Sequence, residues 1–472
     1  MSPRIEEILH MLEEISSRDM DPHSGRMFGH IYETGDKELR ILAEKAYSMY
    51  MWKNMLDPTV YPSIIEMERS LVRSVGRFFN LPEEGSGTFT YGGTESIIIA
   101  VLGARQLHRR REGASHAMKI VLPETAHPAF HKAAHLLGVG VKVVKVDKDS
   151  FTVNPENIAD SLSGDVGMIV LSAPNYPFGT MDPVKPVAEM LGNRNIWLHV
   201  DNCIGLNLPF IRLEGAGLPP FDFELEQVYS ISTDMHKYGY SPKNGSLVLF
   251  KTRELRKNTM FSYSRWAGYP LINTTILSSR SAGSLAAAWA VFNYLGEEGY
   301  RLQARRVLNA RNKIMDGLRR LGYRINGEPV GGVFSFTSSE VNLFALSQAV
   351  RKGGWYIQAQ PGSAYLGYEP AIHMTIAPIH DTVSEEFLKD LEDATREAHG
   401  TPLPPQTAMR FAVQTGLLGS QTSIEDALEV LIDKAGLDKG EIDEVLVNEL
   451  IHIFPPEVVE DVLKEFIIHL YG

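Results

Sequence analysis

The chain has 472 residues, 44% of them hydrophobic and 22% charged, which is the composition of a globular protein with room for two or three domains. Its net charge of -12 argues against a nucleic-acid partner, and no apolar run approaches the roughly 18 residues that a membrane span needs. A single cysteine, Cys203, excludes an internal disulfide and favours a cytoplasmic location.

The first half of the chain is predicted to be an α/β protein. Residues 1–60 form an N-terminal helical segment in this interpretation, with a helix from about Asp36 to Trp52. Residues 61–295 alternate helical periodicity with the strand-like runs MKIVLP, VKVVKV, GMIVLSAP, IWLHVD, QVYSIS and GSLVLF. Strands that alternate with helices predict a mostly parallel sheet covered on both faces, so this range is expected to be the large domain.

The second half begins with a long helical stretch from Gly283, which Gly296 and Gly299 are expected to interrupt. It leads into a smaller α+β domain, residues 296–400. The proline-rich break HGTPLPPQT then precedes an acidic helical extension, residues 401–472. This extension holds 13 acidic and 4 basic residues, so the rest of the chain is close to neutral and can contain a basic pocket for an anionic ligand.

One lysine lies in the turn between the last two strand-like runs. The segment SISTDMHKYGYSPKNGSLVLF passes from a strand through His236 and Lys237 to a second strand. Because α/β proteins bind ligands beyond the ends of their strands, Lys237 is expected at the mouth of the sheet. An isolated His-Lys pair usually lies on the surface, so the surrounding residues decide between the two interpretations.

Further features supply groups that a lysine-bound cofactor needs. Asp201 ends the apolar run IWLHVD, where a carboxylate costs free energy unless a partner pairs with it. Gly93 and Thr94 join a glycine pair to a helix N-terminus, which is an anion site. His127 can stack on a planar ring. With Lys237 to form a Schiff base and Asp201 to protonate a pyridine nitrogen, the set meets the demands of pyridoxal 5'-phosphate (PLP).

A metal site is the alternative for the histidines. His127, His131 and His135 are spaced four apart in PETAHPAFHKAAHLLG, which could place zinc ligands on one helix face. No cysteine or fourth ligand lies near them in the sequence, and Pro128 falls within the row. No metal is therefore expected, and His131 and His135 are interpreted as ordinary helix residues.

These motifs resemble those of a known family. The pattern SxxDxHKYGYxPKxxSLVL closely resembles the cofactor-lysine segment of the PLP-dependent group II decarboxylases, and within them the sphingosine-1-phosphate lyase branch. HVDNCIGL is similar to the family's HVDAxxGG, with Asn202 in place of the alanine, and the position of His127 matches the ring-stacking histidine of SxHxxxxKAA. GGTES matches the phosphate turn, although Tyr91 replaces the usual serine before the glycine pair.

The resemblance runs from about Gly25 to His399 and implies an aspartate-aminotransferase-type fold with a seven-stranded, mostly parallel sheet. It also implies a homodimer with its active site at the subunit interface. The expected catalytic residues are Lys237, Asp201 and His127. The expected cofactor-binding residues are Gly93, Thr94, His127, Asp201, His236, Lys237 and Ser279.

The substrate is less clearly implied, because the sequence departs from the lyases where substrate binds. Asp57 stands in NMLDP where the lyases read NPLHP, and it is similar to the amino-acid decarboxylases. Leu271 occupies the position of a lyase tyrosine, although Tyr269 is nearby. Lys243, however, is retained six residues after Lys237, where the lyases use a lysine for the substrate phosphate; a solvated turn lysine is the alternative. The expected substrate-binding residues are Lys243, Asn54, Asp57, Tyr61, Tyr91 and Arg280.

Three functions follow in order. The first is a PLP-dependent carbon–carbon lyase that cleaves a phosphorylated amino alcohol by retro-aldol chemistry. The alternative is an amino-acid decarboxylase of the aspartate, glutamate or tyrosine type. The third is a catalytically inactive relative that serves as a scaffold, against which the intact Lys237, Asp201, His127 and GGT set argues. The expected partners are a small amine or amino-acid substrate and a second copy of the chain, with no nucleic acid and no membrane span.

Overall fold

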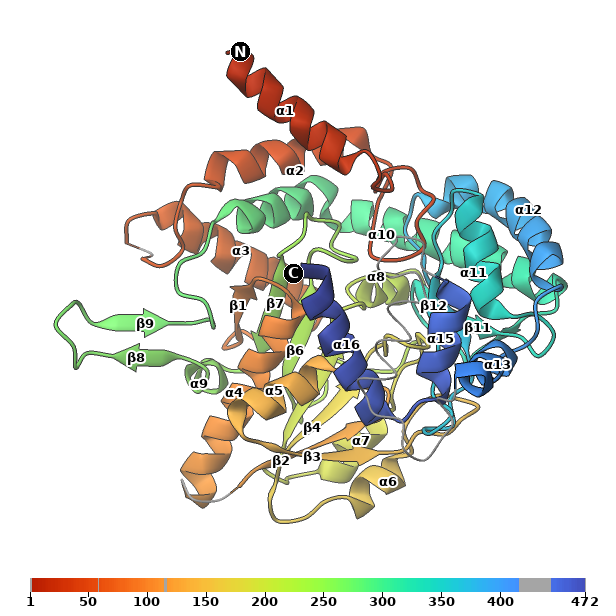
Figure 1. The fold of residues 1–472 in the computed structure, drawn as a ribbon. Helices are drawn as coiled ribbons and strands as arrows, with labels where there is room; N and C mark the ends of the chain where they lie inside the picture. Colours follow the sequence, from red (N-terminus) through yellow and green to blue (C-terminus); the bar gives the residue numbers. More distant parts are fainter. Residues whose placement is uncertain (1, 58, 114–116, 416–442, 472) are drawn as a thin grey trace.

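A seven-stranded sheet forms the centre of the protein (Figure 1). The computed structural model describes residues 2–57, 59–113, 117–415 and 443–471. Neighbouring strands from β6 to β3 are parallel, whereas β7 is antiparallel to both β1 and β6, so the predicted, mostly parallel sheet is confirmed. The strands in spatial order are β1 (Ser86–Thr90), β7 (Ser246–Phe250), β6 (Val228–Asp234), β5 (Trp197–Asn202), β4 (Val166–Ser172), β2 (Lys119–Pro123) and β3 (Gly140–Val144).

Helices cover both faces of this sheet, which explains why its strands are continuous apolar runs. In β4, Ile169 and Leu171 join the core on one face, while Met168 and Val170 join the core on the other. The second face is covered by α4 (Gly93–Glu112) and α5 (Ala129–Leu137). The first is covered by α3 (Pro62–Phe78), α6 (Pro155–Asp160), α7 (Val184–Leu191), α8 (Leu208–Leu213) and α10 (Gly283–Arg320).

The N-terminal segment packs along the longest helix. Helix α1 (Pro3–Ser16) is exposed, and α2 (Lys37–Tyr50) lies against α10. The Asp36 side chain accepts hydrogen bonds from the first backbone N–H groups of α2, as expected for an N-cap, so the predicted helix is confirmed. The predicted break in α10 is also confirmed, because Gly296 has a φ of 56° and a ψ of -172°.

A second sheet of four antiparallel strands lies beside the first, in the order β10 (Arg324–Ile325), β11 (Val333–Thr337), β13 (Ala371–Thr375) and β12 (Gln358–Gln360). Helices α11 (Leu343–Lys352) and α12 (His380–Ala398) pack together beside this sheet (Figure 1). In the acidic extension, α13 (Gln406–Thr415) and α15 (Glu444–Ile453) pack on each other, and α15 packs on α11. The Pro455–Pro456 pair predicts a helix start, and the last helix, α16 (Pro456–Tyr471), begins there. Ser423, which the sequence marks as a second helix cap, lies outside the described residues.

The structure contains strands that the sequence did not predict. The edge strand β1 is polar and runs directly into the glycine turn before α4. Strands β8 (Phe261–Tyr263) and β9 (Leu271–Asn273) form a hairpin that projects from the body of the molecule (Figure 1), with Trp266 and Ile272 exposed. Helix α9 (Arg253–Lys257) precedes this hairpin. Among the described residues, none of the helices has the length and hydropathy of a membrane span.

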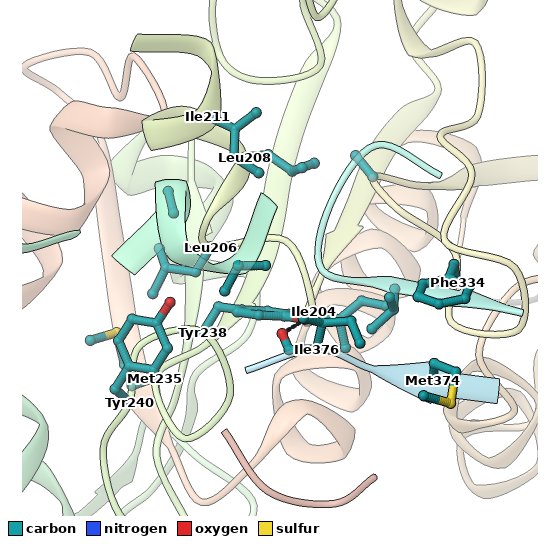
Figure 2. Packing of buried hydrophobic residues seen from close by; sticks show 14 of the residues in the cluster. Ile204, Leu206, Leu208, Ile211, Met235, Tyr238, Tyr240, Phe334, Met374 and Ile376 are labelled. Carbon is teal, nitrogen blue, oxygen red and sulfur yellow. Dashed lines mark hydrogen bonds between the residues drawn. The ribbon is translucent and has the colours of Figure 1, made fainter. Parts of the chain in front are cut away.

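The turn that follows β6 is held by buried tyrosines (Figure 2). Tyr238 is fully buried, and its hydroxyl donates a 3.0 Å hydrogen bond to the carbonyl of Ile376, which follows β13. The hydroxyl of Tyr300 on α10 donates a 2.9 Å bond to the carbonyl of Gly239. Two other parts of the fold thus fix this turn, and with it the backbone of the neighbouring Lys237.

Candidate active site

The expected cofactor residues meet at the carboxyl ends of the parallel strands. Lys237 follows β6, His127 lies in the link after β2, and Gly93 begins α4. These residues and Thr94 line one cavity of about 280 Å³, which also contains Lys243. A crevice beyond the carboxyl ends of strands is where open α/β sheets bind ligands.

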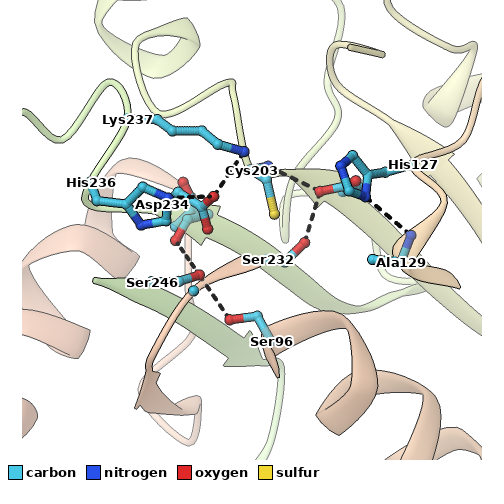
Figure 3. A network of polar contacts seen from close by, with 12 residues as sticks. Ser96, His127, Ala129, Cys203, Ser232, Asp234, His236, Lys237 and Ser246 are labelled. Carbon is cyan, nitrogen blue, oxygen red and sulfur yellow. Dashed lines mark hydrogen bonds and ion pairs between the residues drawn. The ribbon is translucent and has the colours of Figure 1, made fainter. Parts of the chain in front are cut away.

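Lys237 pairs with a carboxylate of the same sequence motif, Asp234. Its Nζ lies 2.9 Å from Oδ2 of Asp234, the last residue of β6 (Figure 3). Burial by itself would lower the pKa of Lys237, but the charge of Asp234 raises that pKa above its ordinary value overall. Burial would likewise raise the pKa of Asp234, but Lys237 and His236 hold it below its ordinary value. The buried pair is therefore an ammonium and a carboxylate.

Asp201 lies at the end of β5, where two hydrogen-bond donors contact its carboxylate. Its Oδ1 accepts 3.0 Å hydrogen bonds from the hydroxyl of Ser232 and from the backbone N–H of Cys203. Ser232 is the register partner of Asp201 on β6, so the parallel pairing of β5 with β6 aims the carboxylate. Burial, followed by the charges of Asp201 and Asp234, raises the pKa of the Cys203 thiol, which therefore stays protonated.

His127 lines the cavity from the link that follows β2. Its Nδ1 accepts a 3.1 Å hydrogen bond from the backbone N–H of Ala129, which orients the ring (Figure 3). Burial lowers the pKa of His127, so the imidazole is neutral at neutral pH. His131 and His135 lie exposed on α5, consistent with their interpretation as ordinary helix residues.

The N-terminus of α4 provides a close-fitting turn. Gly92, before the first helical residue, has a φ of 137°, which side chains rarely adopt. A Cβ at Gly93 would lie 2.8 Å from Sγ of Cys203 and 2.9 Å from Oδ2 of Asp234. The backbone N–H groups of Gly93 and Thr94 thus approach the cavity without an intervening side chain, as an anion-binding helix end requires.

These residues fit PLP. The Lys237 amine would hold its aldehyde carbon, the Asp201 carboxylate its pyridine nitrogen, and the α4 N-terminus its phosphate, while the neutral His127 ring would cover one face. Among the described residues, the buried Asp234 carboxylate contacts Lys237 Nζ at 2.9 Å and His236 Nε2 at 3.6 Å, and no hydroxyl or backbone N–H satisfies its oxygens. Its negative charge balances the lysine that is expected to bind the cofactor.

Sequence reasoning gave no role to several residues of this site. Asp234 and Cys203 line the cavity, and the charge of Lys237 acts on the hydroxyls of the half-buried Tyr32 and Tyr176. The Tyr176 hydroxyl donates a 2.8 Å bond to Gln358 Oε1, which no local motif predicts. The position of Asp234 at a strand end, three residues before Lys237, is the signal that could have identified it.

The expected substrate residues divide into two groups. Lys243 and Tyr91 line the cofactor cavity, and the hydroxyl of Tyr91 donates to the carbonyl of Ser281. The second group lies outside the lining of the cavity. In it, the side chain of Asn54 donates a 3.3 Å bond to the exposed Ser279.

The remaining members of the second group have local roles. Asp57 is exposed and accepts hydrogen bonds from the backbone N–H and hydroxyl of Thr59, which hold the pKa of Asp57 below its ordinary value. The buried Arg280 donates a 3.1 Å bond to the carbonyl of Phe89. Tyr61 directly precedes α3. Ser279, Arg280 and Asp57 are not among the residues that line the cofactor cavity of their own chain, and Asp201, two residues before Cys203 in the sequence, is also outside that lining.

Comparisons with known proteins identify the family. The model of the pyridoxal-dependent decarboxylase conserved domain matches residues 20–336. The sphingosine-1-phosphate lyase of Oryza sativa subsp. japonica is 33% identical over 407 residues, which cover 84% of this chain and 74% of the relative. A probable L-tyrosine/L-aspartate decarboxylase of Methanothermobacter thermautotrophicus is 29% identical and is covered over 97% of its length, with 78% of this chain.

Comparison with solved structures supports the same family and fold. The sphingosine-1-phosphate lyase of Burkholderia pseudomallei superposes with a TM-score of 0.79 at 31% identity, covering 90% of this chain and 96% of that one. A glutamate decarboxylase of Lactobacillus brevis has a TM-score of 0.75 at 22% identity, over 85% of this chain and 94% of that one, and supports the fold. The expected fold type and cofactor are confirmed. The chain belongs to the pyridoxal-dependent decarboxylase family and is a PLP-dependent enzyme of the sphingosine-1-phosphate-lyase-like type.

Proposed function

We propose that the protein cleaves the Cα–Cβ bond of a phosphorylated amino alcohol by retro-aldol chemistry. The observation that carries this proposal is the position of Lys243, which lines the same cavity as Lys237. Its Nζ donates a 2.5 Å hydrogen bond to the carbonyl of His30, and no salt bridge within the described residues holds it. A cation beside the cofactor lysine is suited to a substrate phosphate.

The electrostatics of Lys243 support the same role. Burial, followed by the charge of Lys237, lowers the pKa of Lys243, so its positive charge is destabilised in the free enzyme. A doubly charged phosphate would offset that cost, because opposite charges attract in direct contact. Lys243 still has exposed surface, so a substrate phosphate can reach it.

When bound, PLP supplies an electron sink for the bond that breaks at Cα. The residues of the chain then have separate tasks in the proposed reaction. Lys243 binds the substrate phosphate, Asp201 keeps the pyridine nitrogen protonated, and His127 positions the ring. Lys237 Nζ, beside the Asp234 carboxylate, is placed to move a proton at the reacting carbon.

The proposal includes a cytoplasmic homodimer whose partner completes the site. Ser279, Arg280 and Asp57 are expected to contact cofactor or substrate, yet none lines the cavity of their own chain. The exposed β8–β9 hairpin, with Trp266 and Ile272, is an apolar surface near the segment that carries Ser279. A partner subunit that covers this surface could receive Ser279 and Asp57 at its own cavity. The single, buried Cys203 is compatible with a reducing compartment.

An amino-acid decarboxylase is the second candidate. The similarity to a probable L-tyrosine/L-aspartate decarboxylase over almost its full length favours it, and Asp57 matches the decarboxylase pattern. In that reaction the Cα–carboxylate bond would break instead, and Lys243 would face a carboxylate.

Product analysis separates the two candidates. Purified enzyme is incubated with a long-chain amino alcohol phosphate and, in parallel, with the twenty amino acids, and the release of aldehyde and of carbon dioxide is measured. We expect aldehyde from the phosphorylated substrate. Carbon dioxide from an amino acid, with no aldehyde from the phosphate ester, would refute the lyase.

Substitution of Lys243 tests its phosphate contact. Loss of a charged hydrogen bond of about 1.5–3 kcal/mol predicts a rise of roughly tenfold or more in KM for the phosphorylated substrate in Lys243→Ala. The control is Lys251→Ala, because Lys251 donates to the backbone carbonyls of Leu225 and Glu226 outside the cavity. Equal KM values in the two variants would contradict the proposed role.

A further inference from the structure

A second cavity lies at the opposite end of α4 from the cofactor. It has a volume of about 440 Å³ and is formed by the last turns of α4, the link between α6 and β4, and the link between α7 and β5. Because β4 and β5 begin here, the cavity faces the amino ends of the strands, whereas the active site lies at their carboxyl ends. No residue lines both cavities.

Two arginines from different elements line this cavity. Arg111 is on the last turn of α4, and Arg194 is in the link before β5. Nη1 of Arg111 donates a 3.0 Å hydrogen bond to the carbonyl of Asn195, which ties the helix end to that link. Arg194 is exposed, and no salt bridge within the described residues holds it.

Positive charge is concentrated around this end of α4. Burial, followed by the charge of Arg109, lowers the pKa of Arg105 one turn earlier, so the cations there repel each other. Glu112 is the one carboxylate in the described lining. The nearby Asp165 is already paired with Lys119, whose Nζ lies 2.7 Å from its Oδ2. A helix C-terminus favours cations, which accounts for the arginines at the end of α4. It does not account for the cavity beside them.

The remaining wall of the cavity is mixed in polarity. Leu107, Val166 and Ile196 contribute apolar surface from the three segments, and serine and asparagine residues of the two links contribute polar surface. His108 is only 8% exposed, and its Nε2 has no hydrogen-bond partner among the described residues. The ring packs so closely on Gly167 that a Cβ there would lie 3.0 Å from Nδ1. A cavity of this size that combines an apolar side with a few polar and charged groups is suited to a small molecule.

We propose that this cavity binds a small organic anion, in which a phosphate or carboxylate head group meets Arg111 and Arg194 and an apolar body lies against Leu107, Val166 and Ile196. A guanidinium pair matches the geometry of both head groups. The site is separate from the cofactor and substrate, and it does not depend on which bond the enzyme breaks.

Calorimetric titration of the PLP-loaded enzyme tests the site directly. Phenyl phosphate and benzoate are the probes, because they share an apolar body and differ in the head group; inorganic phosphate tests the head group by itself. We expect at least one organic probe to bind with a Kd below about 1 mM, and inorganic phosphate to bind more than tenfold more weakly. Comparison of the two organic probes identifies the preferred head group.

Matched variants locate the binding. A Cβ at Gly164, which lines the cavity, and one at Gly217, which does not, would each have no atom within 4 Å, so both positions tolerate a side chain. Gly164→Glu and Arg194→Glu should weaken binding by tenfold or more, while Gly217→Glu and Lys243→Ala should leave it unchanged. The visible absorbance of bound cofactor verifies that each variant is folded.

Three results would overturn the proposal. The first is no binding of either organic probe at about 1 mM. The second is unchanged affinity in both Gly164→Glu and Arg194→Glu. The third is a loss of affinity in Lys243→Ala, which would assign the bound anion to the active site. Inorganic phosphate that binds as tightly as phenyl phosphate would refute the apolar part of the site.

Discussion

Asp234 and Lys237 lie three residues apart at the end of β6, and their ion pair determines the charge of the cofactor cavity. The 2.9 Å contact keeps the lysine an ammonium in the protein without cofactor, in spite of its burial. At the facing edge, Gly93 lies against Cys203 and Asp234 so closely that no side chain can be added. The charge of the site thus depends on one close ion pair, and its shape depends on the absence of a side chain at Gly93.

Gly93→Ala is predicted to weaken cofactor binding. The new methyl group would lie 2.8 Å from Sγ of Cys203 and would force the α4 N-terminus or the carboxylate of Asp234 to shift. Overpacking of this kind costs about 1–3 kcal/mol, which corresponds to a Kd for PLP that is roughly tenfold higher or more. Titration of the apoenzyme with PLP, followed by absorbance, measures the change. Gly217→Ala is the control, because its Cβ would contact nothing; equal Kd values in both variants would contradict the prediction.

At the level of elements, the ends of strands and helices bring the site together. Strands β5 and β6 end side by side, so that Ser232 hydrogen-bonds Asp201 across the pair. Helix α12 performs a similar task for the N-terminal segment. His380, its first residue, accepts a 2.9 Å bond from the backbone N–H of Ala377, interacts at 3.1 Å with the carbonyl of Met27, and stacks on Phe28.

The stability that His380 contributes is predicted to depend on pH. Burial lowers the pKa of His380 from 6.5 to about 3, so the unfolded chain takes up a proton first as the pH falls. The contribution of the neutral ring is therefore complete above the unfolded pKa and is lost below it, by up to about 1.4 kcal/mol per pH unit. The stability difference between wild type and His380→Gln should shrink between pH 7 and pH 5, as measured by urea denaturation. The exposed His131→Gln should show no such trend; a pH-independent difference for His380→Gln would refute the mechanism.

At the level of the whole molecule, one chain holds an incomplete set of the expected residues. Lys237, Asp201, His127 and Lys243 converge at the carboxyl ends of the sheet. Ser279, with Asn54 beside it, belongs to a separate exposed cluster near the β8–β9 hairpin. The acidic extension, by contrast, is integrated into its own chain. Glu449 on α15 is fully buried and accepts bonds from the backbone N–H of Ala408 and the side chain of Asn342.

Mixing of two inactive variants tests whether a second copy completes the site. Lys237→Ala removes the lysine expected to bind the cofactor, and Ser279→Tyr blocks the exposed cluster, so each homodimer should be inactive. Random exchange of subunits should give heterodimers with one intact site, and about a quarter of the wild-type activity. Light scattering checks that the protein is a dimer. A monomeric enzyme, activity in Ser279→Tyr alone, or no recovery on mixing would each contradict the shared site.

Local patterns in the sequence were sufficient to predict the cofactor. Lys237, Asp201, His127 and the Gly93–Thr94 turn each lie at a strand end or a helix N-terminus, and the residues next to them in the chain reveal such positions. The alternation of strand-like runs with helical periodicity predicted a sheet covered on both faces, and the two cores that share β4 agree with it. The edge strand β1 was missed because its polar composition is that of a turn.

Only the tertiary structure shows that Lys243 lines the cofactor cavity and Asp57 does not. The two residues lie 186 positions apart, and no local sequence pattern relates them. The same reason applies to Tyr176 with Gln358, to Glu449 with Asn342, and to Arg111 with Arg194 around the second cavity. The cofactor could be predicted from the sequence because the residues expected to hold it lie at strand ends and a helix N-terminus, beside recognisable local motifs. The surroundings of the substrate required the fold, because they depend on distant segments packed against each other.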